Sequence, residues 1–174
     1  TIKGLVEDGI SYTGFLYVGL MIDQTGNPRV LEYNCRSGDP ETQPILLRLQ
    51  TDLADLCMAA MAGELHRVEI DWDNRTTLGV VMAARGYPDH YPKGEIIEGI
   101  HDAETDGVKV FHAGTAIENG NIITSGGRVL CVTALGDNVI QAQAAAYRSV
   151  RRIRWPNAYY RPDIGYHAIA HANP

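Results

Sequence analysis

The sequence predicts an α+β protein built from two units, of which the second is small, rich in β-strands and carries one long helix. Several short stretches of branched and aromatic residues are bounded by turn-forming residues, which is typical of antiparallel strands. Residues 138–154 instead repeat apolar side chains at the spacing of an amphipathic helix. A polar, charged stretch over residues 64–75 reads as a linker, so we expect the units to cover residues 1–75 and 76–174.

Composition and charge limit the class of protein. The hydrophobic fraction of 45% is ordinary for a globular chain, so a real core is available. The net charge of −6 argues against a general nucleic-acid surface. No apolar run approaches the ~20 residues of a membrane span, and no signal peptide is recognisable. Three scattered cysteines are typical of reduced thiols. We therefore expect a cytoplasmic protein that binds neither nucleic acid nor membrane.

The first unit opens with a predicted β-hairpin. Residues 11–22 form an apolar strand with glycines at positions 14 and 19, and residues 23–28 supply the turn. The chain then returns as a strand over residues 30–36. Asp23 falls within the turn, so we interpret it as a turn residue rather than a metal ligand.

Two helices are predicted after the hairpin. A short one begins near Pro44, and a longer one runs from an N-cap at Asp52 to a stop at Gly63. The longer helix has apolar residues at the spacing of a buried stripe, namely Leu53, Leu56, Cys57, Ala60 and Met61.

The second unit is predicted to contain strands over residues 78–84, 108–112 and 129–135, with turns at 86–88 and 93–94 and a hairpin turn at 118–121. Asp137 is the predicted N-cap of the long helix that ends near Arg154. The apolar positions of this helix share one face, namely Val139, Ala142, Ala146, Val150 and Ile153.

The strand over residues 30–36 carries the most specific chemical pattern. Alternation places Glu32, Asn34 and Arg36 on one face. Glu32 and Asn34 lie two residues apart, which is about 7 Å along a strand. A carboxylate oxygen and an amide oxygen from such a pair can both reach one Mg²⁺ ion, which prefers oxygen ligands. The alternative is the solvated face of a half-buried sheet. The polar loop over residues 38–43 favours a site, because loops carry sites more often than the elements they join.

The segment Glu-Tyr-Asn-Cys-Arg-Ser-Gly-Asp-Pro-Glu-Thr-Gln over residues 32–43 resembles the signature of the phosphoribosylamine–glycine ligase family, also called glycinamide ribonucleotide synthetases, within the ATP-grasp superfamily. Further segments follow in the family's order, at residues 12–17, 78–84, 86–88, 111–115, 126–130 and 163–165. The resemblance covers the whole chain but only the C-terminal part of the enzyme. Ser37 stands where phenylalanine is usual and His167 where arginine is usual.

This resemblance implies both a fold and an activity. Residues 1–75 would form the C-terminal half of an ATP-grasp domain, and residues 76–174 the small β-rich C-terminal domain. The implied reaction joins glycine to 5-phosphoribosylamine in purine synthesis, with glycyl phosphate as intermediate and ADP and phosphate as products. ATP is the co-substrate, and Mg²⁺ or Mn²⁺ is the implied metal.

The resemblance also assigns roles to residues. Glu32 and Asn34 would hold the metal, and Arg36 would be catalytic, either stabilising the transferring phosphoryl group or orienting the glycine carboxylate. Asp39 would bind the glycine ammonium, and Glu41 would hold the loop or help position the amine. The chain begins at Thr1 without methionine, so we expect the phosphate-covering loop and its lysines in an N-terminal lobe of the same enzyme. The chain alone is expected to be inactive.

Two alternatives stay open at this point. One is a different ATP-grasp carboxylate–amine ligase with the same metal row, against which the loop after Arg36 argues. The other is a non-catalytic module that only folds or mediates an interaction. Metal-dependent nucleotide binding would separate this module from both ligases.

Overall fold

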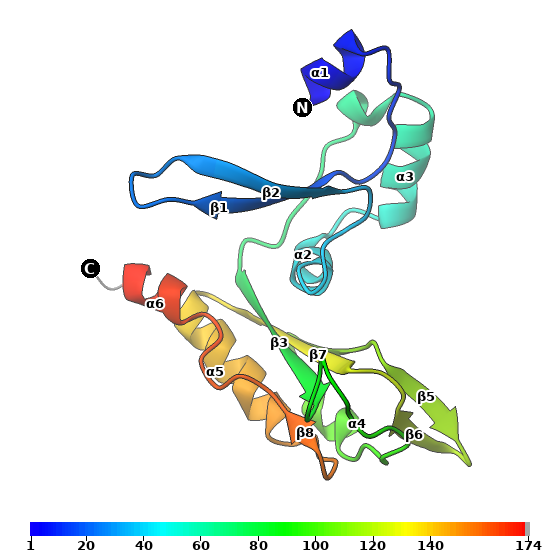
Figure 1. Cartoon of the computed structure of the whole chain (residues 1–174), viewed down its shortest axis with the longest axis vertical. Coiled ribbons are helices and arrows are strands. Elements are labelled where there is room, and N and C mark those ends of the chain that lie inside the picture. The colour runs from blue at the N-terminus through cyan, green and yellow to red at the C-terminus, as the bar shows by residue number, and fades with distance from the viewer. Residues whose placement is uncertain (173–174) are drawn as a thin grey trace. The chain divides into compact units, whose positions relative to one another are not determined.

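The computed structural model describes residues 1–172 and divides into two compact units (Figure 1). The first unit contains Thr1–Asp39 and Leu49–Trp72. The second contains Pro40–Arg48 and the described residues from Asp73 onwards. The segment Pro40–Arg48 therefore groups with the β-rich unit, although it precedes the linker in sequence.

The first unit consists of a hairpin and short helices, namely α1 (Ile2–Glu7), β1 (Tyr17–Ile22), β2 (Pro28–Asn34), α3 (Leu53–Met61) and the 3₁₀ turn η1 (Leu65–Arg67). β1 and β2 pair in antiparallel fashion, as predicted, but the strand before the turn starts later than expected. The helix α1 was not predicted.

Asp23 organises the turn between β1 and β2. Its Oδ1 accepts hydrogen bonds from the Thr25 backbone N–H at 2.9 Å, the Thr25 hydroxyl at 2.6 Å and the Asn27 backbone N–H at 3.0 Å. The hydroxyl bond from Thr25 is the main reason why the pKa of Asp23 is lowered. The role of Asp23 as a turn residue is thus confirmed.

Helix α3 begins where predicted, because Asp52 accepts a hydrogen bond from the Ala54 N–H at 2.7 Å. Gly63 follows its end with a φ of 72°, which suits glycine. The predicted buried stripe is wrong: no residue of α3 is buried, and Met61 is 79% exposed. The buried hydrophobic residues of the described chain all belong to the second unit. The apolar residues of α3 are therefore not part of the buried core.

The second unit contains α2 (Thr42–Arg48), β3 (Thr76–Ala84), α4 (Ile100–Ala103), β4 (Val108–His112), β5 (Thr115–Glu118), β6 (Asn121–Thr124), β7 (Arg128–Gly136), α5 (Val139–Val150), β8 (Ala158–Tyr159) and α6 (Tyr166–Ala172). An antiparallel sheet has the strand order β4-β7-β3-β8, and β5 and β6 form a separate hairpin. These elements, with the two-unit division, confirm an α+β fold.

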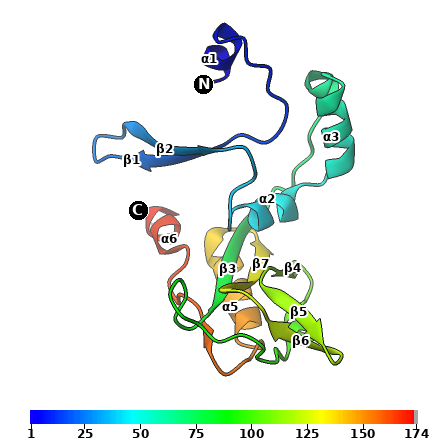
Figure 2. The ribbon, with the colours of Figure 1, turned by 45° about the vertical axis from the view of Figure 1, so that its right-hand side comes forward.

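Helices cover both faces of this sheet (Figures 1 and 2). On one face, Leu78 and Val80 of β3 join Ala142 and Ala146 of α5 in the core. On the other face, α2 lies close to β3: the Thr77 hydroxyl donates to the carbonyl of Pro44 at 3.1 Å. A Cβ added at Gly79 would lie 3.0 Å from the Pro44 ring. This close approach explains why α2 belongs with the second unit.

Most predicted elements of the second unit are present, with two corrections. The hairpin turn at Asn119 and Gly120 has φ values of 50° and 79°, as an Asn-Gly turn requires. Residues 95–99, which follow the predicted turn at 93–94, make only single bridges, Ile96 with Ile123 and Glu98 with Arg154. Helix α5 is shorter than expected, and its N-cap is Asn138 rather than Asp137.

Candidate metal and phosphate site

The candidate site lies on β2, where a bulge sets the pairing with β1. Glu32 lies opposite Gly19, and Asn34 lies opposite Tyr17. The register then shifts, because Leu20 pairs with Val30 and leaves Leu31 as the extra residue. The bulge thus falls directly before the predicted metal ligands.

Glu32 and Asn34 are brought together by the strand. The Asn34 Nδ2 donates a hydrogen bond to Glu32 Oε1 at 3.0 Å. The Asn34 amide oxygen and the second carboxylate oxygen of Glu32 are not used in this bond, so both can serve as ligands.

This donor set fits Mg²⁺ or Mn²⁺ bound with a nucleotide. Such ions usually take one or two side-chain carboxylates or carbonyls and complete their coordination with water and phosphate oxygens. Within residues 1–172, no group of three or more His, Cys, Asp and Glu side chains is placed to hold a metal by itself. The oxygens of Glu32 and Asn34 therefore suit an ion shared with a phosphate rather than a closed protein cage.

The other predicted residues follow β2 along the chain. The Arg36 Nη1 donates to the Ser37 carbonyl at 2.9 Å, and the Arg36 side chain is exposed. Asp39 is exposed at the end of the segment that belongs to the first unit. Glu41 belongs to the second unit, where its carbonyl accepts a hydrogen bond from the Ile45 N–H at the start of α2.

Gly19 was noted from the sequence as a glycine within a predicted strand but not as a site residue, yet it lies beside the site. A Cβ built at Gly19 would be 3.1 Å from the Glu32 Cγ. The available signal was a glycine inside a predicted strand, which often marks a bulge or a close approach. Its partner across the hairpin depends on the bulge, which the sequence pattern did not reveal.

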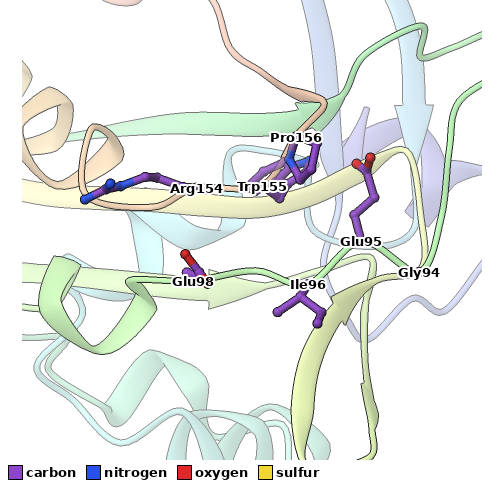
Figure 3. Close-up of a pocket in the computed structure, with 7 residues that line it drawn as sticks. All are labelled: Gly94, Glu95, Ile96, Glu98, Arg154, Trp155 and Pro156. Atoms are coloured by element: carbon purple, nitrogen blue, oxygen red, sulfur yellow. The ribbon is translucent and has the colours of Figure 1, made fainter.

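A separate cavity of about 560 Å³ lies in the second unit (Figure 3). It is lined by Gly94, Glu95, Ile96, Glu98, Arg154, Trp155 and Pro156. Glu95 Oε2 and Trp155 Nε1 are buried and have no hydrogen-bond partner among the described residues. The residue pattern that indicates a metal and phosphate site lies on β2, so the row on β2 remains the candidate site.

No helix within residues 1–172 is long and apolar enough to cross a membrane. None of the three cysteines, all of which lie within residues 1–172, forms a disulfide: Cys35 and Cys57 are exposed and Cys131 is buried.

The sequence matches two family models. Residues 77–167, more than half of the chain, match the phosphoribosylglycinamide synthetase C domain. Residues 1–42, which include Glu32, Asn34 and Arg36, match the ATP-grasp (A) domain of the same synthetase.

Curated relatives match almost the whole chain. The phosphoribosylamine–glycine ligases of Vibrio cholerae and Pseudomonas aeruginosa are 57% and 58% identical to it over 170 residues. The match covers 98% of this chain and 40% of each relative. The chain therefore spans about two-fifths of the length of these relatives.

Solved structures agree with these matches. The crystal structure of phosphoribosylamine–glycine ligase from Thermotoga maritima matches 94% of this chain and 40% of its own, with a TM-score of 0.79 and 35% identity. The biotin carboxylase domain of the Hydrogenobacter thermophilus 2-oxoglutarate carboxylase matches with a TM-score of 0.65. Its 16% identity supports a likeness of fold alone. Taken with the two domain matches, these similarities show that the chain belongs to the phosphoribosylglycinamide synthetase family.

Proposed function

We propose that this chain is the C-terminal part of a ligase that joins glycine to 5-phosphoribosylamine at the expense of ATP. The observation that carries the proposal is the oxygen pair of Glu32 and Asn34, joined by a 3.0 Å hydrogen bond on a strand that matches the family's ATP-grasp domain. The chain's relatives are ligases of this name. Because the chain spans 40% of their length, the remaining parts of the site are assigned to an N-terminal lobe of the same enzyme.

The reaction has two chemical steps. A glycine carboxylate oxygen attacks the γ-phosphorus of ATP, which gives glycyl phosphate and releases ADP. The amine of phosphoribosylamine then attacks the acyl carbon, and phosphate leaves as the amide forms. Catalysis of phosphoryl transfer depends mainly on positioning and on neutralising charge.

Glu32 and Asn34 would hold Mg²⁺ or Mn²⁺ through their side-chain oxygens. When bound, such an ion neutralises negative charge on the phosphate oxygens. The hydrogen bond from Asn34 to Glu32 fixes the two side chains relative to each other before any ligand arrives. This preorganisation reduces the ordering cost of binding.

Arg36 is the group that we assign to the reacting phosphoryl group or to the glycine carboxylate. Its planar guanidinium suits either oxyanion. In the structure it donates to the Ser37 carbonyl, a neutral acceptor next to it in the chain. Exchange of this neutral partner for an anionic oxygen is favourable, since charge-assisted hydrogen bonds are the stronger ones.

Asp39 and Glu41 are assigned to the amine-bearing substrates. Asp39 would pair with the ammonium group of glycine, and Glu41 would hold the loop or help position the attacking amine. Both side chains are exposed, and both follow the metal row directly.

The exposed free thiols of Cys35 and Cys57 support a reducing, cytoplasmic setting for the reaction.

The substitution Glu32→Gln in the full-length ligase tests the proposal. It keeps the size of the side chain but removes the charge that faces the ion. We expect turnover to fall at least a hundredfold, which corresponds to ~2.7 kcal/mol in the transition state, while folding is retained. The measurement is glycine-dependent ADP release with phosphoribosylamine present.

The matched control is Glu118→Gln, at an exposed position of the β5–β6 hairpin. It removes the same charge in the second unit and should leave turnover unchanged. Near-normal ADP release by the Glu32 variant would contradict the metal-ligand assignment.

A further inference from the structure

We infer that Gly19 is a positioning residue for the Glu32 carboxylate, an inference that rests on the proposed function. The two residues pair directly across the hairpin, and a Cβ at position 19 would lie 3.1 Å from Glu32 Cγ. Ordinary contacts between carbon atoms are ~3.5–4.0 Å. A side chain at position 19 would therefore fit only if the Glu32 Cγ moved by a few tenths of an ångström.

Backbone conformation does not explain this glycine. Gly19 is absent from the positive-φ glycines of the described chain, so an L-residue can adopt its backbone angles. A glycine inside a strand costs stability, roughly 0.5–1 kcal/mol relative to alanine. The contact with Glu32 is the steric requirement that the structure shows at this position.

The bulge at Leu31 creates the pairing. Continued without a shift, the register of Leu20 with Val30 would place Leu31 opposite Gly19 and Glu32 opposite Val18. The extra residue moves Glu32 opposite the glycine and Asn34 opposite Tyr17. Bulge and glycine thus act together, because one brings Glu32 to this place and the other leaves room for its side chain.

Gly19 affects the hydrogen-bonded pair of Glu32 and Asn34 rather than Glu32 alone. The carboxylate that lies over Gly19 accepts the 3.0 Å hydrogen bond from Asn34. A methyl group at position 19 requires the Glu32 Cγ to move by a few tenths of an ångström. Because this carbon carries the carboxylate, we expect the movement to weaken the bond from Asn34. The Glu32 and Asn34 oxygens are then less well placed to bind one ion.

The test is Gly19→Ala, with Gly4→Ala as matched control. Gly4 lies in α1 of the same unit, and a Cβ there would meet nothing within 4 Å. The first readout is the ¹H–¹⁵N signal of the Asn34 side-chain amide in this chain without metal. We expect it to shift in the Gly19 variant and to stay in place in the control.

The second readout is metal affinity in the full-length ligase. We expect the apparent dissociation constant of Mn²⁺ with ATP, followed by water-proton relaxation, to rise about tenfold in Gly19→Ala, since small misplacements in a site can cost up to about a hundredfold. The Michaelis constant for Mg²⁺ should rise with it, more than kcat falls. A merely structural role would lower thermal stability without this split.

The outcomes separate this inference from the proposed function. Unchanged amide signals and a Mn²⁺ affinity within twofold of wild type would overturn the role of Gly19 while leaving the ligase intact. A wild-type enzyme without Mn²⁺·ATP binding or glycine-dependent ADP release would overturn the proposed function. In that case the amide signal alone would still decide whether Gly19 positions Glu32.

Discussion

At the scale of single residues, the hydroxyl of Tyr147 joins helix α5 to the segment that leads into α6. It donates to the Arg161 carbonyl at 2.6 Å and accepts from the Ile164 N–H at 3.0 Å. Gln143 adds a bond from its Nε2 to the Ile164 carbonyl at 2.8 Å. Burial raises the pKa of the Tyr147 phenol, so it stays neutral and able to donate.

Tyr147→Phe is expected to lower the free energy of unfolding by about 1–3 kcal/mol, because it leaves partly buried backbone groups without their partner. Urea denaturation of this chain measures the change. The control is Tyr159→Phe. Tyr159 is 51% exposed, so the loss of its hydroxyl should cost little stability. Equal stabilities for the two variants would show that the hydroxyl contributes nothing to holding the segment.

At the scale of elements, α5 is a helix defined by its cap and its small buried residues. Asn138 Oδ1 accepts a hydrogen bond from the Gln141 N–H at 3.0 Å. Ala142 lies so close to β7 that a Cβ at Gly136 would be 2.3 Å from the Ala142 nitrogen. The start of the helix is therefore held by both a side chain and a close backbone approach.

Asn138→Ala is expected to cost ~1 kcal/mol of stability through loss of the N-cap. Asp137→Ala, one position earlier, is the control: its backbone N–H bonds to Gln141 Oε1, and this bond survives the substitution. Thermal unfolding of both variants gives the comparison. A larger loss from Asp137→Ala would instead assign the cap to Asp137.

At the scale of the whole molecule, the chain matches about two-fifths of its relatives. The sequence contains the oxygen pair and Arg36, but it contains no glycine-rich loop with lysines that could cover a triphosphate. Phosphates held from one side stay largely in water, where each charge interaction is weakened by the high dielectric constant.

We therefore predict that the 174-residue chain alone binds Mg·ATP with a dissociation constant of about 1 mM or weaker, near −4 kcal/mol. Glycine should not stimulate ATP hydrolysis by this chain. Isothermal titration with Mg·ATP and an ADP-release assay provide the measurements, with Glu32→Gln as the reference for non-specific binding. Micromolar affinity in the chain alone would mean that the nucleotide site is complete within these residues.

The local features and the family could be predicted from the amino-acid sequence alone. Asp52 as an N-cap, the Asn119-Gly120 turn and the strand over residues 108–112 all appear as predicted. Each depends on chemistry within a few residues: a side chain that satisfies a nearby N–H, or a residue that tolerates positive φ. The family signature over residues 32–43 could also be recognised from the sequence, because the order of its residues is itself the signal.

The contacts between residues distant in the chain could not be predicted in this way and are seen in the three-dimensional structure. The bulge at Leu31 places Glu32 opposite Gly19, and the approach of Pro44 to Gly79 assigns α2 to the second unit. The apolar spacing of α3 predicted burial, but the buried hydrophobic core described here lies elsewhere. Strand register and burial depend on partners that are distant in the chain. A local pattern indicates that one face of a helix is apolar, but it does not indicate which residues cover that face.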